Sequence, residues 1–213
     1  EVVLPAEDGG EDHTPFRDLR SRLGDSDLPG GTCDRAQDIF ARLAAAEGAV
    51  HGVDPEDVTF HEVGAWDSIA DIVGAAHLIE QRGDARWSVS SLPMGAGTVK
   101  SAHGDLPLPA PAVVELLKGF ALHDDGRKGE RITPTGAAIL AHLQPVQDGV
   151  HGPERLAESG IGFGTKVFPG ISNVLRVLEF ESAGAAIGED QVAVLRFEVF
   201  DQSPEDLSAG LDN

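Results

Sequence analysis

The clearest helical pattern in the chain runs over residues 68–79, SIADIVGAAHLI. Its apolar side chains recur at helical spacing, so one face of the predicted helix packs on a core. Gly83 follows, and a glycine just past the last periodic residue is a common end for a helix. The apolar face comprises Ile69, Ile72, Val73, Ala76 and Ile79.

Helical and strand patterns continue on both sides of this helix. Upstream, we expect a short helix over 15–23 and a longer one that follows Thr32 or Asp34 and stops at Gly52. Downstream, prolines at 111 and 134 open predicted helices that run to 118 and 143. Strands are predicted at 87–92, from 98, at 173–180 and at 192–200, and a further helix opens at 203.

Two of these segments carry further expectations. Residues 160–164, GIGFG, predict a loop with unusual backbone angles, because glycine tolerates them. The strand at 173–180 is apolar on both faces, which predicts a central position in its sheet. The sequence therefore predicts an α/β fold (mixed α+β) with helices packed on a central mixed sheet.

Composition limits the classes of function. The chain has 213 residues, with 16 Lys and Arg against 36 Asp and Glu, a net charge of −20. Phosphate backbones and anionic membrane surfaces repel such a chain, so neither nucleic acid nor a membrane is an expected partner. The charge is explained either by solubility or by attraction of cations.

The single cysteine, Cys33, excludes an internal disulfide framework and a thiolate metal cluster. The sequence contains neither an apolar run long enough for a membrane span nor a secretory signal pattern, so we expect a cytoplasmic protein. Any bound metal must then be held by His, Asp and Glu.

Such side chains are concentrated between positions 47 and 71. Imidazole nitrogen combined with carboxylate oxygen suits nickel, zinc or manganese. A structural explanation stays open. Asp67 can cap a helix, and Ser68 and Asp71 fit a capping box. Glu47 and His51 can form an ordinary exposed pair on one helix face. The metal-ligand candidates are Glu47, His51, His61, Glu62, Asp67 and Asp71.

Two further segments could bind an anion. Residues 94–100, MGAGTVK, combine bare glycine amides with a lysine, which suits a phosphate, although a tight hairpin is the simpler explanation. Residues 133–136, TPTG, could present hydroxyls and amides at a helix start, or simply cap it. The candidate residues are Gly95, Gly97, Lys100, His103, Thr133 and Thr135.

Taken in order, these motifs resemble the LarC nickel-insertion family, which matures the nickel-pincer cofactor of lactate racemase. The resemblance covers roughly residues 35–180 and depends on the order of the motifs, since each alone is common. The matching segments are 60–74, 92–100, 103–111, 133–138, 160–165 and 173–176.

The resemblance implies a nickel chelatase, a metal-inserting lyase. Members insert Ni²⁺ into pyridinium-3,5-bisthiocarboxylate mononucleotide and form two nickel–sulfur bonds and one nickel–carbon bond, using CTP with Mn²⁺ or Mg²⁺. It implies catalytic roles for His61, Glu62 and Asp71. It also implies nickel binding by these three with His51 and Asp67, and cofactor binding by the anion candidates above.

The residues and the resemblance together predict a domain plan and partners. An acidic, flexible lead-in at 1–30 precedes an N-terminally truncated nickel-insertion domain at 31–181, a linker at 182–190 and the start of a truncated C-terminal domain at 191–213. CTP use belongs to that second half, which leaves the activity of the fragment alone open. The expected partners are the mononucleotide precursor, the lactate racemase apoenzyme and a second copy of the chain.

Two other functions remain open from the residues themselves. The chain could be a nickel carrier or scaffold without catalysis, since the net charge of −20 attracts cations. It could also be a metal-dependent phosphoesterase that uses the ligands between 61 and 71.

Overall fold

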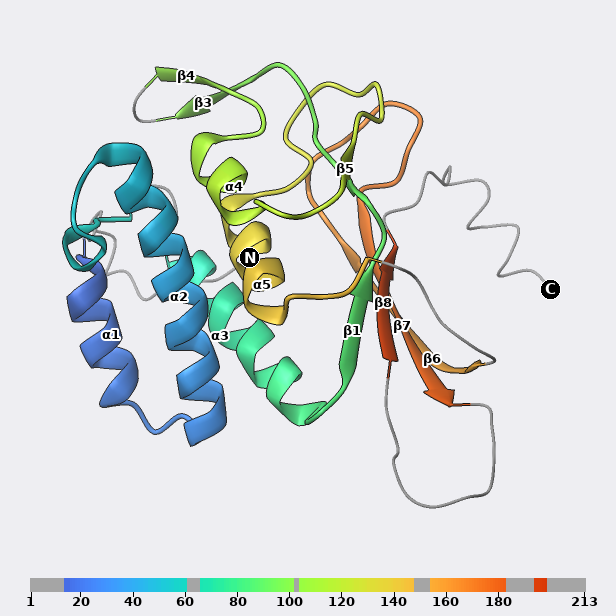
Figure 1. The fold of residues 1–213 in the computed structure, drawn as a ribbon, viewed down its shortest axis with the longest axis horizontal. Helices are drawn as coiled ribbons and strands as arrows, with labels where there is room; N and C mark the ends of the chain where they lie inside the picture. The colour runs from blue at the N-terminus through green and yellow to red at the C-terminus, as the bar shows by residue number, and fades with distance from the viewer. Residues whose placement is uncertain (1–13, 61–65, 102–103, 148–153, 183–193, 199–213) are drawn as a thin grey trace. The chain divides into compact units, whose positions relative to one another are not determined.

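A computed structural model describes residues 14–60, 66–101, 104–147, 154–182 and 194–198 (Figure 1). The chain divides into two compact units. The first comprises residues 1–83 and 93–144, and the second comprises residues 84–92 and 145–213.

All helices of the described residues lie in the first unit. They are α1 (Phe16–Gly24), α2 (Gly30–His51), α3 (Trp66–Gln81), α4 (Pro111–Leu116) and α5 (Pro134–Leu143), with a short 3-10 helix, η1 (Pro55–Asp57). Strands β3 (Thr98–Ser101) and β4 (Gly104–Pro107) form an antiparallel hairpin. Strands β2 (Leu92–Pro93) and β5 (Leu122–His123) form a second short pair.

Helix α2 is the centre of this unit. Helices α1, α3, α4 and α5 all pack against it, and α1 and α3 run beside it in Figure 1. Its inward side chains Ile39, Phe40 and Leu43 have no solvent-accessible surface. The Phe60 ring packs on Phe40 with ring centroids 6.0 Å apart. Full burial of each such side chain contributes about 1.5–3 kcal/mol.

Both ends of α2 are set by glycines. The helix begins at Gly30, earlier than the sequence predicted, and the Glu80 carboxylate from α3 lies against Gly31 so closely that a Cβ there would clash with it. A carboxylate is stabilised beside the amides of a helix N-terminus. Gly52 ends the helix in the left-handed conformation at φ +68°, which confirms the predicted stop.

The second unit contains a four-stranded sheet in the order β1-β8-β7-β6. Its strands are β1 (Arg86–Val89), β6 (Glu154–Phe163), β7 (Val174–Ser182) and β8 (Val194–Glu198). Strand β1 pairs with β8 in parallel, and the other two pairs are antiparallel. Strand β7 lies between β8 and β6, which confirms the predicted central strand.

The prediction of a loop at 160–164 is wrong over most of its length. Strand β6 continues to Phe163, and Gly160 and Gly162 pair with Val177 and Leu175 of β7. Neither glycine has a positive φ. The ladder uses only backbone groups, so the neighbouring strand overrides the low strand propensity of glycine.

The mixed α/β class is confirmed. Packing of the helices on the sheet stays a prediction, as does the domain plan. The lead-in over 1–13, most of the linker and the helix predicted from 203 lie outside the described residues.

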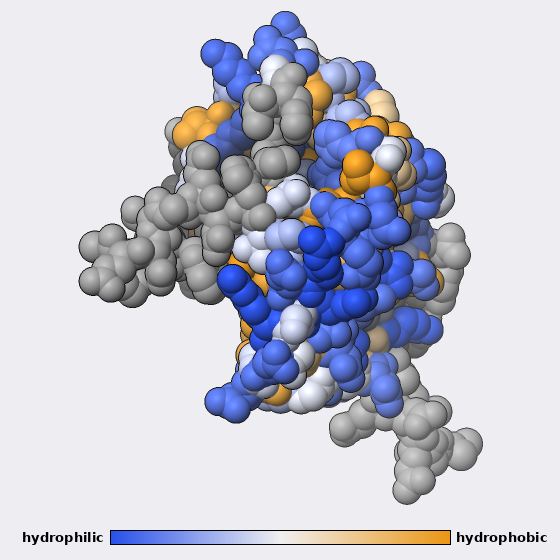
Figure 2. Space-filling view, turned by 90° about the vertical axis from the view of Figure 1, so that its left-hand side faces the viewer, coloured by the Kyte–Doolittle hydropathy of each residue, from blue (hydrophilic) through white to orange (hydrophobic). Residues whose placement is uncertain are grey.

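The surface agrees with the acidic composition. Figure 2, seen from the side on which α1 lies in Figure 1, shows mainly hydrophilic residues with scattered apolar patches. Among the helices in the described part of the chain, none is both long and apolar enough to cross a bilayer.

A polar cluster joins α5 to α2. Asp38 Oδ2 accepts a hydrogen bond from His142 Nδ1 at 2.6 Å and another from Arg42 Nε at 2.7 Å. Burial raises the pKa of Asp38, but the bonds from His142 and Arg42 more than offset that effect, so its pKa lies below the ordinary value. The ionised carboxylate therefore stabilises the contact between the two helices.

The pKa of Asp38 predicts a loss of stability in acid. Because the folded-state pKa lies below the unfolded value of about 3.9, the stabilisation is complete above about pH 4 and is lost as the pH falls through the folded-state pKa. Urea unfolding of the wild type and Asp38→Asn should differ by about 1 kcal/mol at neutral pH. The difference should shrink in acid, and a pH-independent difference would contradict this assignment.

Candidate functional site

The strongest candidate for a binding site is the turn at residues 94–97 between β2 and β3, called here the glycine turn. Two hydrogen bonds fasten it to β5 and the loop after β5: Met94 N–H donates to the His123 carbonyl at 2.9 Å, and Gly129 N–H donates to the Ala96 carbonyl at 2.7 Å. Leu108 N–H donates to the Gly97 carbonyl at 2.9 Å. The turn is therefore held through one amide and two carbonyl groups.

The backbone of this turn is paired on its amide side as well. Ala96 forms an isolated antiparallel bridge with Gly129, which lies in the loop after β5. Gly95 is buried, and Gly95 and Gly97 have φ of +72° and +95°. The glycine turn is therefore a tight and well-fastened connection, and anion binding by its residues stays a prediction.

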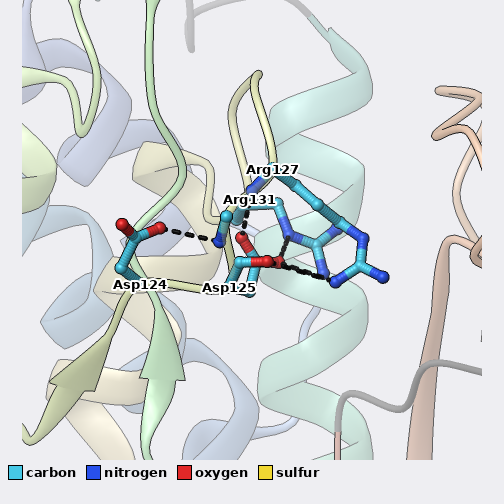
Figure 3. A network of polar contacts seen from close by, with 5 residues as sticks. Asp124, Asp125, Arg127 and Arg131 are labelled. Atoms are coloured by element: carbon cyan, nitrogen blue, oxygen red, sulfur yellow. Dashed lines mark hydrogen bonds and ion pairs between the residues drawn. The ribbon is translucent and has the colours of Figure 1, made fainter.

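A largely buried ion pair lies in the loop after β5 (Figure 3). Arg131 Nε donates to Asp125 Oδ2 at 2.9 Å, and the two side chains are only 5% and 9% exposed. Arg127 adds a backbone hydrogen bond to Asp125 Oδ1 and a guanidinium contact to the Asp125 carbonyl at 3.3 Å. Asp125, Arg127 and Arg131 form the clasp.

The clasp touches the turn directly. A Cβ added to Gly95 would overlap the Gly129 carbonyl oxygen and would lie 3.0 Å from Arg131 Cγ. Glycine at position 95 is therefore required both by its backbone angles and by this close approach.

The local charge suits an anion. Residues 93–136 contain five basic and five acidic side chains, so this segment is neutral while the rest of the chain carries the whole net charge of −20. A segment without net charge repels an anionic ligand less than the acidic remainder of the chain does.

The other predicted anion-binding residues lie in three different settings. Thr133 is the N-cap of α5, and its hydroxyl accepts a hydrogen bond from Gly136 N–H at 3.2 Å, so the capping role is confirmed. Thr135 lies in the first turn of α5. Lys100 lies on β3 opposite Asp105, and His103 lies outside the described residues.

Only part of the predicted nickel site is described. His51 Nε2 lies 3.4 Å from Glu47 Oε2 near the end of α2, and Asp71 is exposed on α3. His61 and Glu62 lie outside the described residues, as does the side chain of Asp67. Among the residues that the structure describes, no three His, Cys, Asp or Glu side chains are grouped closely enough to hold a metal ion. The nickel ligands stay a prediction.

The capping box at Ser68 is wrong in its register. Helix α3 begins at Trp66, so Ser68 is the third helical residue rather than the residue before the helix. Asp67 consequently lies in the first turn of α3.

Sequence reasoning missed two polar pairs. Asp38 and His142 are 104 positions apart, and no local pattern links residues that meet only through helix packing. Asp125 and Arg131 are six positions apart in the loop after β5. The run Asp124-Asp125-Gly126 signals a turn there, but burial of its carboxylate cannot be read from that signal.

Comparison with known proteins gives the same class as the motifs. The model of the family described as "Nickel insertion protein" matches residues 2–213. A protein of Geobacter sulfurreducens with the name "Putative nickel insertion protein" is 46% identical over 200 residues, which cover 92% of this chain and 51% of that protein. The protein of the same name from Geobacter metallireducens is 44% identical over 207 residues, which cover 95% of this chain and 52% of that protein.

The chain therefore belongs to the nickel insertion protein family, which confirms the resemblance found in the ordered motifs. It spans about half the length of the curated relatives that it matches. No solved structure matches the chain.

Substitution at Gly95 should destabilise the first unit more than the same change at Gly97. Gly95→Ala combines a strained φ of +72° with overlap on the Gly129 carbonyl, and we expect a loss of at least about 2 kcal/mol. Gly97→Ala meets no atom within 4 Å and should cost about 1 kcal/mol from strain alone. Urea unfolding followed by circular dichroism measures both, and equal losses would refute the close approach.

Proposed function

We propose that this protein inserts nickel into pyridinium-3,5-bisthiocarboxylate mononucleotide and so forms a nickel-pincer cofactor of the lactate racemase type. The observation that carries the proposal is the family match over residues 2–213. This chain spans about half the length of its relatives. We therefore propose CTP use with Mn²⁺ or Mg²⁺ only for a full-length protein. We also propose that this protein acts in the cytoplasm. The proposed recipient of the product is a lactate racemase apoenzyme.

The metal chemistry needs ligands that release nickel as well as bind it. Nitrogen and oxygen donors hold Ni²⁺ less firmly than the soft thioacid sulfurs of the product. Transfer of Ni²⁺ from the protein to the sulfurs therefore lowers the free energy. The proposed donors lie from the end of α2 to the first turns of α3: His51, His61, Glu62, Asp67 and Asp71. Nickel is cargo in this scheme and leaves with the product.

Formation of the nickel–carbon bond needs a base. The ring carbon loses one proton as the metal bonds to it, and that proton must pass to a positioned imidazole or carboxylate. We assign this step to His61, Glu62 or Asp71. Of these, Asp71 lies exposed on α3, where it can exchange the proton with solvent.

The mononucleotide also carries a phosphate monoester. A lysine, hydroxyls and the amides of a glycine-rich turn or a helix start suit such a group. We assign it to the residues that the sequence singled out for an anion, which are Gly95, Gly97, Lys100, His103, Thr133 and Thr135.

The reaction itself tests the proposal. Intact full-length protein, incubated with the bisthiocarboxylate precursor, Ni²⁺, CTP and Mn²⁺, should yield a nickel-containing product, detected by its mass and by activation of a lactate racemase apoenzyme. Asp71→Asn should slow this conversion at least about 100-fold if it is the base. Absence of product from the wild type would end the proposal.

A nickel carrier without catalysis is the second candidate, favoured by the net charge of −20. Calorimetric titration with Ni²⁺ separates the two, since a carrier binds tightly and stoichiometrically without converting the precursor. His61→Ala and Asp71→Ala should each weaken nickel binding under both schemes. A hydrolase of generic phosphate esters would instead show turnover of such esters with Mn²⁺ alone.

A further inference from the structure

The loop that joins β6 to β7 forms a groove. Its volume is about 370 Å³, and it is lined by residues 163–168 and 171–173. The loop contains none of the residues assigned above to nickel, to the proton or to the phosphate. Small-molecule sites are clefts of about 300–1,000 Å³ that combine apolar walls with a few polar groups. The size of the groove therefore suits a single ring with its substituents.

A tight turn shapes the floor of the groove. Pro169 and Gly170 lie at its centre, Gly170 has φ of +77°, and Ile171 N–H donates to the Phe168 carbonyl at 3.5 Å. Proline followed by a glycine with positive φ is typical of a type II turn. The turn places Phe168 and Ile171 side by side, and each is only 6% exposed.

Asn173 fastens the two ends of the loop. Its Nδ2 donates to the Lys166 carbonyl at 3.0 Å, and Gly164 N–H donates to the Asn173 carbonyl at 2.8 Å. A Cβ on Gly164 would lie 2.3 Å from Asn173 Nδ2, so this close approach requires glycine. The groove is therefore preformed, and a ligand binds without the cost of ordering the loop.

The groove offers aromatic surface beside a cation. The Phe163 ring at the end of β6 is 72% exposed, and burial of such a ring against a flat partner is favourable. Lys166 Nζ lies 5.6 Å from the centre of the Phe168 ring, a cation–π contact that keeps the ammonium group beside the groove. A ligand here can thus contact a ring and a positive charge together.

The charge near the groove favours an anion. Residues 159–178 contain two basic side chains, Lys166 and Arg176, and no acidic one, in a chain with a net charge of −20. An anion is repelled less by this hairpin than by the acidic remainder of the chain. A neutral ring would leave the Lys166 ammonium unused, and a cation would be repelled by it.

We propose that this groove binds a planar aromatic carboxylate, with the ring against Phe163 and Phe168 and the carboxylate on Lys166. The proposed substrate, a pyridinium ring with two anionic thioacid groups, belongs to the same chemical class. Only the identity of the natural ligand rests on the proposed function. The groove itself is tested with a simple ring.

The test is a titration of isotopically labelled full-length protein with pyridine-3,5-dicarboxylate. The amide resonances of Gly164, Thr165, Lys166 and Ser172 should shift to saturation, with a dissociation constant on the order of 1 mM. Pyridine-3,5-dicarboxamide has the same ring without the charge and should bind about fivefold more weakly. Inorganic phosphate, which has charge without a ring, should leave these resonances in place at the same concentrations.

Two substitutions of exposed side chains separate the two contacts. Lys166→Met removes the cation and should raise the dissociation constant about fivefold. Phe163→Leu removes the ring but keeps an apolar side chain, and should raise it about threefold. Lys118→Met is the matched control, because it makes the same change of charge at an exposed lysine that pairs with Glu115 on α4, and it should leave binding unchanged.

Four results would overturn the inference: no shift of the loop amides, equal binding of the neutral diamide, the same shifts with phosphate alone, or equal weakening by Lys118→Met. Failure of the proposed function looks different. In that case the groove still binds the dicarboxylate with the expected order of variants, but no nickel product forms. A full-length protein that makes the product without binding the dicarboxylate would refute this inference alone.

Discussion

The first unit depends on the burial of one helix, α2, by four others. Ala36 and Ala44 on its surface are completely buried, and such small side chains let neighbouring helices approach closely. Leu43 and Phe40 then fill the spaces that remain. Because the chain has no tyrosine and few other aromatic residues, close approach of small residues replaces the large side chains that fill most cores.

Packing of the helices on α2 also stabilises the glycine turn. Helices α4 and α5 pack on α2 and on each other, and the chain between them carries β5 and the clasp. The loop thus runs between two anchored points, with the Thr133 cap of α5 at its end. A buried Asp125–Arg131 bond can persist there because neither partner is free to move into solvent.

The arrangement of charge complements this geometry. A chain with a net charge of −20 attracts divalent cations and repels anions, whereas the proposed reaction would bring both kinds of ion together. The segment at 93–136 has no net charge and therefore repels an anion least. The candidate nickel ligands and the candidate anion-binding residues are accordingly different groups.

The sequence by itself determined the helices, the central strand, the mixed class and the family, because periodic apolar positions, prolines, glycines and ordered motifs are local signals. It also singled out Gly95 and Gly97. Only the tertiary structure decided that residues 160–163 form a strand, that Asp38 meets His142, and that Arg131 closes over Gly95. Those outcomes depend on which distant backbone or side chain arrives as a partner, and burial of a polar group is favourable only where that partner is in place.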